Sequence, residues 1–260
     1  MNTKKTITAD GFLRNSQPNA LIAAPLWTLI FFSQLVVSCL VAWHLLAQVN
    51  FVYPAAYEAL AIDEHIARFA PANRFRPDFE TTDKPQHLAL FAEIGNAVQN
   101  HGEGLEKITY QTASGQTIAL LRKAEVIHLQ DVANLVDFFY LSGGVCTLLL
   151  LISLAGAYSL KLTFPGPGAV AMGILAVVAA ITLPLLIIGP KKVFYWLHIQ
   201  IFPPDHEWFF YYQESLMTTL MKAPDVFGFI GGVMGLIALV LWILQILAVR
   251  WYFAKRPGTK

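Results

Sequence analysis

Charged residues are what this sequence has least of. Only 13% of its 260 residues are Asp, Glu, Lys or Arg, about half of the roughly 25% that is usual in soluble globular domains. The deficit is local, because long apolar runs alternate with stretches of ordinary polarity. The basic residues form no clustered face of the kind that a nucleic-acid-binding domain uses, so we expect no nucleic-acid partner.

Motifs built on a standard nucleophile are also missing. The sequence contains no Gly-x-Ser-x-Gly elbow, no His-Glu-x-x-His and no phosphate-binding glycine loop. Its two cysteines, Cys39 and Cys146, fall in apolar runs, where we interpret them as small apolar filler. No Cys/His cluster has metal-ligand spacing, so we predict no metal and no cofactor. Any chemistry must come from histidines and carboxylates.

Long apolar runs are what the sequence has instead. Four of them reach the ~20 residues that a membrane-spanning helix needs, at about 21–46, 135–160, 168–188 and 227–249. The first run is longer than the apolar core of a signal peptide and no small-x-small cleavage site follows it, so we interpret it as a retained anchor. We predict a mainly α polytopic membrane protein with four transmembrane helices and a small mixed α/β extracytoplasmic domain between helices 1 and 2.

The distribution of basic residues predicts the orientation. Lys and Arg collect on cytoplasmic flanks, and both ends of this chain are basic, whereas residues 47–131 carry more acids than bases. Both termini are therefore expected in the cytoplasm and the active face outside it. The expected order is a cytoplasmic tail (1–19), TM1 (20–46), an extracytoplasmic domain (47–131), TM2 (132–160), TM3 (168–189), an extracytoplasmic or interfacial aromatic segment (190–225), TM4 (226–249) and a cytoplasmic tail (250–260).

Local patterns predict the elements of the extracytoplasmic domain. Residues 53–69 and 86–98 have the periodicity of helices, and 105–121 alternates on both sides of an Ala-Ser-Gly-Gln turn, which is typical of a β-hairpin. A further helix is expected to run from Lys123 directly into TM2. In TM4, the glycines of residues 231–235 would allow close helix packing.

Three titratable residues at the start of that long helix are candidates for chemistry. Glu125, His128 and Asp131 are spaced by three, so they share one helix face. A carboxylate beside an imidazole can fix its tautomer and raise its basicity, which suits a general base. The alternative interpretation is a solvated, charged helix end above the membrane.

A second histidine lies in the aromatic segment 190–225. His198 is surrounded by Tyr, Trp and Phe at the expected membrane interface, where an ionisable group suggests a functional site and the alternative is a histidine bonded to backbone or headgroups. Asp137, just inside TM2, would be costly in lipid, so we expect it to face the bundle or a wet cavity. The other histidines are interpreted as surface, solvated or interfacial: His44, His65, His87, His101 and His206.

Two blocks around these histidines resemble a known family. Residues 125–132 are similar to a Glu-x-x-His-(Leu/Met)-x-Asp-Val signature, and residues 198–216 are similar to a His-x-Ile-Phe-Phe-Pro, Trp-x-Phe, Ser/Thr-Leu signature. Both signatures are typical of the bacterial lipoprotein intramolecular transacylase family. The order of span, outer domain, first histidine, two spans, second histidine and last span is similar too. The second block departs from the signature at Ile201, where the family has an aromatic residue.

The resemblance implies a reaction and a set of site residues. In that family the sn-2 acyl chain of a diacylglyceryl-lipoprotein moves to the α-amine of its N-terminal cysteine, which gives a lyso-form lipoprotein. His128 and His198 would be the catalytic pair, with Asp131 and Glu125 as orienting partners. The substrate pocket would include Tyr195, Phe202, Trp208 and Asp137. The implied location is the bacterial plasma (inner) membrane, and the implied partners are a lipid-modified protein and membrane lipid.

The sequence is therefore consistent with two functions from different classes. The first is an acyltransferase of lipoprotein maturation in the bacterial cell envelope, working by histidine acid–base catalysis. The second is a non-catalytic envelope chaperone or binding protein for a lipidated membrane partner, which would not need both histidines. The first requires His128 and His198 to reach one reacting site, so their separation distinguishes the two.

Overall fold

The computed structural model describes residues 20–256, so the expected tail 1–19 and residues 257–260 lie outside the described part of the chain. The α-helices are α2 (Ala20–Gln48), α3 (Tyr53–Ala59), α4 (Ile62–Phe69), α5 (Lys84–Gln99), α6 (Lys123–Ser159), α7 (Pro167–Ile187), α8 (Pro190–Ile201), α9 (Leu216–Met221) and α10 (Asp225–Ala254). The 3₁₀ helices are η1 (Asn50–Val52), η2 (Ala70–Ala72), η3 (Phe79–Thr81) and η4 (Leu105–Lys107), and the strands are β1 (Thr109–Gln111) and β2 (Thr117–Ala119).

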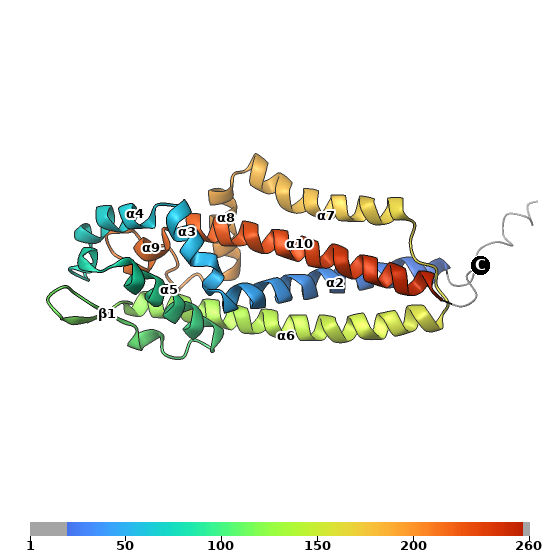
Figure 1. The fold of residues 1–260 in the computed structure, drawn as a ribbon, viewed down its shortest axis with the longest axis horizontal. Coiled ribbons are helices and arrows are strands. Elements are labelled where there is room, and N and C mark those ends of the chain that lie inside the picture. The colour runs from blue at the N-terminus through green and yellow to red at the C-terminus, as the bar shows by residue number, and fades with distance from the viewer. Residues whose placement is uncertain (1–19, 257–260) are drawn as a thin grey trace, which may run out of the picture.

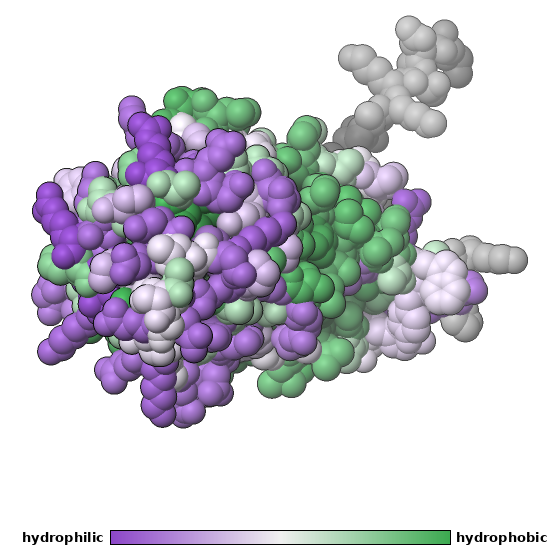
Figure 2. Space-filling model, turned by 60° about the vertical axis from the view of Figure 1, so that its left-hand side comes forward, coloured by the Kyte–Doolittle hydropathy of each residue, from purple (hydrophilic) through white to green (hydrophobic). Residues whose placement is uncertain are grey.

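Within residues 20–256, four helices are long and apolar enough to cross a membrane: α2, α6, α7 and α10. Helix α2 packs against both α6 and α10, while α7 runs apart from these three helices (Figure 1). Figure 2 shows a polar mass of side chains at one end of the molecule and an apolar surface along the helices next to it. This chain is therefore a mainly α, multi-pass membrane protein with a small two-stranded sheet, as the sequence predicts.

The end of the bundle that carries α3–α5, the β-hairpin and α9 is called the polar end here. The start of α2 and the end of α10 lie at the opposite end (Figure 1). Helix α6 has 37 residues, which at 1.5 Å each is about 55 Å and exceeds the ~30 Å hydrocarbon core. Its first turns, which carry Glu125, His128 and Asp131, therefore extend into the polar end.

Helices α2 and α6 approach each other closely at a glycine. A Cβ added to Gly143 of α6 would lie 2.2 Å from Leu40 Cδ2 of α2, closer than packed atoms allow. No close packing occurs at residues 231–235 of α10 in the described part of the chain, because a Cβ at Gly231, Gly232 or Gly235 would meet nothing within 4 Å. Periodicity located the helices, but not the side on which their neighbours pack.

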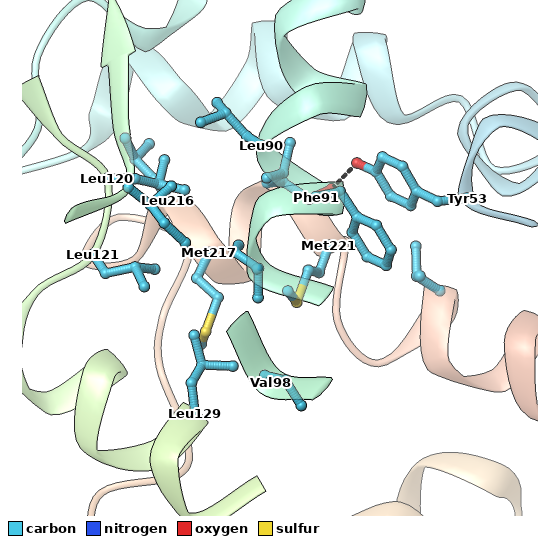
Figure 3. Packing of buried hydrophobic residues seen from close by; sticks show 14 of the residues in the cluster. Tyr53, Leu90, Phe91, Val98, Leu120, Leu121, Leu129, Leu216, Met217 and Met221 are labelled. Atoms are coloured by element: carbon cyan, nitrogen blue, oxygen red, sulfur yellow. Dashed lines mark hydrogen bonds between the residues drawn. The ribbon is translucent and has the colours of Figure 1, made fainter. Parts of the chain in front are cut away.

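The polar end has a hydrophobic core of its own. Tyr53 of α3 stacks on Phe91 of α5 with ring centroids 3.8 Å apart, and its hydroxyl donates to the Leu220 carbonyl of α9 at 2.6 Å. Figure 3 shows Met217 of α9 beside Leu129 of α6, so this core reaches the residue that follows His128. Segments distant in sequence are thereby fixed to the start of α6.

The predicted helix over 53–69 is two helices. Leu60 ends α3 and Ala61, with a φ of +47°, redirects the chain into α4. The predicted hairpin is confirmed, with Tyr110 opposite Ile118. The surface assignment of His65 and His87 is wrong, because both are buried in the polar end. His87 bonds Tyr57 Oη at 2.8 Å and Thr82 Oγ1 at 2.6 Å.

Residues 188–224 form a compact return across the polar end. Gly189, with a φ of +94°, separates α7 from α8, and Pro190 occupies the first turn of α8, where its missing N–H costs nothing. The chain leaves α8 at Phe202, runs without regular structure to Ser215 and enters α9. Ser215 caps α9 by accepting the Thr218 backbone N–H at 2.9 Å.

Candidate functional site

Helices α6 and α8 bring two histidines together at the polar end. His128 lies in the second turn of α6 and His198 in the last turn of α8, and their ring centroids are 6.1 Å apart. Phe202 packs against both rings, at 4.9 Å from His128 and 5.1 Å from His198. Residues 70 positions apart in the sequence therefore face one space, a separation at which two imidazoles can serve one reacting group.

Backbone geometry fixes the tautomer of His198. Its Nδ1 lies 2.8 Å from the Phe194 carbonyl oxygen, which can only accept, so Nδ1 carries the hydrogen and Nε2 keeps its lone pair. The ring also packs on Phe194 at 3.9 Å and on Trp208 at 5.0 Å. Burial lowers the pKa of His198 from its ordinary value, although the Phe194 carbonyl acts in the opposite direction. His198 is thus a neutral imidazole at pH 7 with an available acceptor nitrogen.

His128 has a different environment. Its side chain is buried, and its Nδ1 has no hydrogen-bond partner among the described residues. A buried polar atom without a partner costs about 1–3 kcal/mol, so native structures keep few of them. The Phe210 ring lies 6.1 Å from the His128 ring.

A cavity of about 630 Å³ opens at the two histidines, within the range of small-ligand pockets. Its walls are mostly apolar and rich in aromatic side chains, and they come from α2, η1, α5, α6, α8, α9, α10 and the segment between α8 and α9. The predicted pocket residues Tyr195, Phe202 and Trp208 line it, together with Trp43, Phe51, Phe91, Phe194, Phe209, Phe210 and Phe227. A cavity with this lining suits hydrocarbon chains next to a polar reacting group.

Asp137 is placed elsewhere. It is not among the residues that line the cavity, and its carboxylate accepts a hydrogen bond from His101 Nδ1 at 2.8 Å. This bond ties α6 to the turn after α5. Asp137 therefore contacts that turn, and it does not line the pocket in which we expected it.

The two predicted orienting carboxylates also bond other groups than His128. Asp131 Oδ2 accepts from His206 Nδ1 at 2.6 Å. Glu125, which is fully buried, accepts from Ser215 Oγ at 2.5 Å and from the Arg122 backbone N–H at 2.6 Å. The geometry does not support a direct hydrogen bond from either carboxylate to His128.

Sequence reasoning missed two polar residues of this region. His206 was expected to be solvated, yet it pairs with Asp131, and this contact raises the pKa of His206. Ser215 belongs to the second block of the resemblance, but that block does not say that its hydroxyl meets Glu125. A link across 75 or 90 residues leaves no local signal, so only the fold reveals it. Within residues 20–256, no group of three or more His, Cys, Asp or Glu side chains is placed to hold a metal ion.

A comparison with protein families points to the same part of the chain. A family model described as Lipoprotein intramolecular transacylase Lit matches residues 91–223, just over half of the chain. The chain belongs to this family. The matched part contains both histidines, nearly all of the aromatic segment and α9, and leaves out α2, the whole of α10 and residues 50–90 of the polar end. None of the curated proteins and none of the solved structures matches this chain.

Proposed function

We propose that this protein moves the sn-2 acyl chain of a diacylglyceryl-lipoprotein to the α-amine of its N-terminal cysteine, with His128 and His198 as acid–base groups. Membership of the transacylase family supports a lipoprotein substrate and acyl transfer. The observation that carries the finer proposal is the convergence of the two imidazoles, 6.1 Å apart, on one aromatic cavity of about 630 Å³.

The proposed transfer is balanced within one substrate molecule. The amine nitrogen adds to the sn-2 ester carbonyl carbon, a C–N bond forms, and the C–O bond to the glyceryl group breaks. One proton leaves the nitrogen and one arrives on the glyceryl oxygen, so neither an activated donor nor a cofactor is consumed. Because amine and ester are in one molecule, positioning alone can supply much of the rate, and about 7–11 kcal/mol is available from such proximity.

The two histidines are suited to the two proton transfers, one from the amine nitrogen and one to the glyceryl oxygen. His198 is neutral at pH 7 and has Nε2 free, so it is suited to take the proton from the attacking amine. His128 faces the same space and is suited to protonate the leaving oxygen. The Nδ1 of His128 has no partner among the described residues, so it is available to a substrate group.

The proposed setting is the bacterial plasma (inner) membrane. Four apolar helices embed the chain, and the cavity lies at the polar end, away from the start of α2 and the end of α10. With basic termini in the cytoplasm, the cavity would lie on the extracytoplasmic side, where mature lipoproteins are exposed. The partners in this proposal are a lipid-modified protein and the membrane lipid around it.

The test is the mass of a lipoprotein N-terminal lipopeptide from a bacterial host that lacks its own N-acylating enzymes. The host expresses the wild type, His128→Ala or His198→Ala. We expect an N-acylated, mono-acylglyceryl peptide with the wild type and an unchanged diacylglyceryl peptide with either variant. An unchanged peptide with the wild type, when the protein is folded in the membrane, would contradict the proposal and favour the non-catalytic envelope role.

A further inference from the structure

The carboxylates on either side of His128 hold one continuous segment. Glu125 lies one turn before His128 and Asp131 one turn after it, on the same face of α6. Asp131 bonds His206 and Glu125 bonds Ser215. Residues 203–215, called the strap here, are thereby fixed to α6 near both ends.

Between these two anchors the strap passes the catalytic space. Trp208 lies 5.0 Å from the ring of His198, and Phe210 lies 6.1 Å from the ring of His128. Both aromatic side chains line the cavity. The strap therefore forms one wall of the space that the two imidazoles face.

Resting on the function proposed above, we propose that His206 and Ser215 are positioning residues of the transacylase site, which hold the strap across His128 through Asp131 and Glu125. This gives the two motif carboxylates a role that differs from orienting a histidine directly. It also explains why both lie three residues from His128 while neither bonds it.

The two anchors have different surroundings. Ser215 and Glu125 are both 0% exposed, and the Ser215 hydroxyl also caps α9, so this anchor is part of the folded core. At the other anchor the side chains of Asp131 and His206 are 15% and 37% exposed. The His206 anchor can therefore be cut without emptying the core, and it is the better one to test.

The His206 anchor has a charge that depends on pH. The hydrogen bond to Asp131 raises the pKa of His206, and Asp131 and Asp205 are the charged groups that face it. The contact is therefore strongest while His206 is protonated and weakens as the pH rises through this raised pKa. An Asn at this position could donate to Asp131 without titrating.

The experiment compares the full-length wild type with His206→Ala and His206→Asn. His101→Gly is the matched control, because His101 forms the same kind of bond to Asp137 of α6, outside the cavity lining, and its φ of +57° suits glycine. Hydrogen–deuterium exchange of residues 203–215 is measured without substrate, and kcat and KM are measured with a diacylglyceryl lipopeptide.

We expect His206→Ala to speed exchange in the strap and to lower kcat roughly tenfold, as the loss of one hydrogen bond to a charged group would. His206→Asn should restore both, and His101→Gly should change neither. The ratio of wild-type kcat to that of His206→Asn should fall as the pH rises through the pKa of His206, since all other titrations cancel.

Wild-type exchange or wild-type kcat in His206→Ala would overturn the proposal, and so would a failure of His206→Asn to restore them. The exchange measurement needs no reaction. If exchange follows the expected pattern while the wild type transfers no acyl chain, the strap anchor stands and the proposed function fails.

Discussion

The two halves of the candidate site belong to regions that are held in very different ways. His128 is on α6, which packs along α2 and, at the polar end, against α5. His198 is on α8, which follows α7, a helix with no buried residue in the described structure. One imidazole is thus part of a packed framework, and the other depends on the aromatic contacts of α8 and the strap. The distance between the two rings therefore depends on those contacts, which include the stacking of Phe194 of α8 on Phe227 of α10.

Removal of either imidazole should have the largest effect, because it tests whether both regions contribute to one reaction. We expect His128→Ala and His198→Ala each to lower kcat/KM by about 10²–10⁴-fold, the usual range for a general acid or base. His44→Ala is the control, since His44 lies outside the cavity lining. Purified, folded variants are assayed with a diacylglyceryl lipopeptide. Full activity in either site variant would remove that region from the chemistry.

The pH dependence tests the burial of His198 in the α8 half. An α-amine has a pKa of about 7.7–8.0, so kcat/KM should fall tenfold per pH unit below that value as the substrate amine becomes protonated. A second, steeper fall begins only when His198 is protonated. Because burial lowers the pKa of His198, this second break should lie below about 6.5. A second break at or above 6.5 would contradict a buried, neutral His198.

A glycine variant tests the packed half. The Cβ of Gly143→Ala would meet Leu40, so it should lower the free energy of unfolding by about 1–3 kcal/mol, as overpacking does. Gly144→Ala is the neighbouring control, because its Cβ would meet nothing within 4 Å. Thermal unfolding in detergent measures the difference. Equal stability of the two variants would show that the α2–α6 contact yields without cost.

An aromatic variant tests how α8 is held. Trp208→Ala removes the ring packed on His198 and should lower kcat about two- to tenfold, the equivalent of one aromatic pair. Trp196 of α8 is largely exposed and does not line the cavity, so Trp196→Ala should leave kcat unchanged. If the two variants behave alike, the strap does not position His198.

The comparison also separates what the sequence could reveal from what it could not. Apolar runs of spanning length and a polar helix start predicted four membrane helices and the extension of α6, because both are local properties of the chain. Glu125, His128 and Asp131 share a face for the same reason. The bonds of Glu125 to Ser215 and of Asp131 to His206 depend on the path of the strap, which no local pattern encodes.

The burial of His65 and His87 was missed for a related reason. Both lie among polar residues in the sequence, and polarity alone predicts a surface position. In the fold, His87 gains hydroxyl partners from Tyr57 and Thr82, and His65 packs on Phe69 and Tyr212. These partners come from separate elements of the polar end, so they become visible only once the elements are packed.

The most direct test of the account is a crossover experiment with the purified protein. Equal amounts of two diacylglyceryl lipopeptides are mixed, one with a deuterated sn-2 acyl chain and a normal peptide, the other with a normal chain and a heavy peptide. Transfer within one molecule predicts N-acylated products in which each peptide carries only its own chain. Products with exchanged chains would contradict the proposed intramolecular reaction, and an absence of N-acylated product would contradict the transacylase function itself.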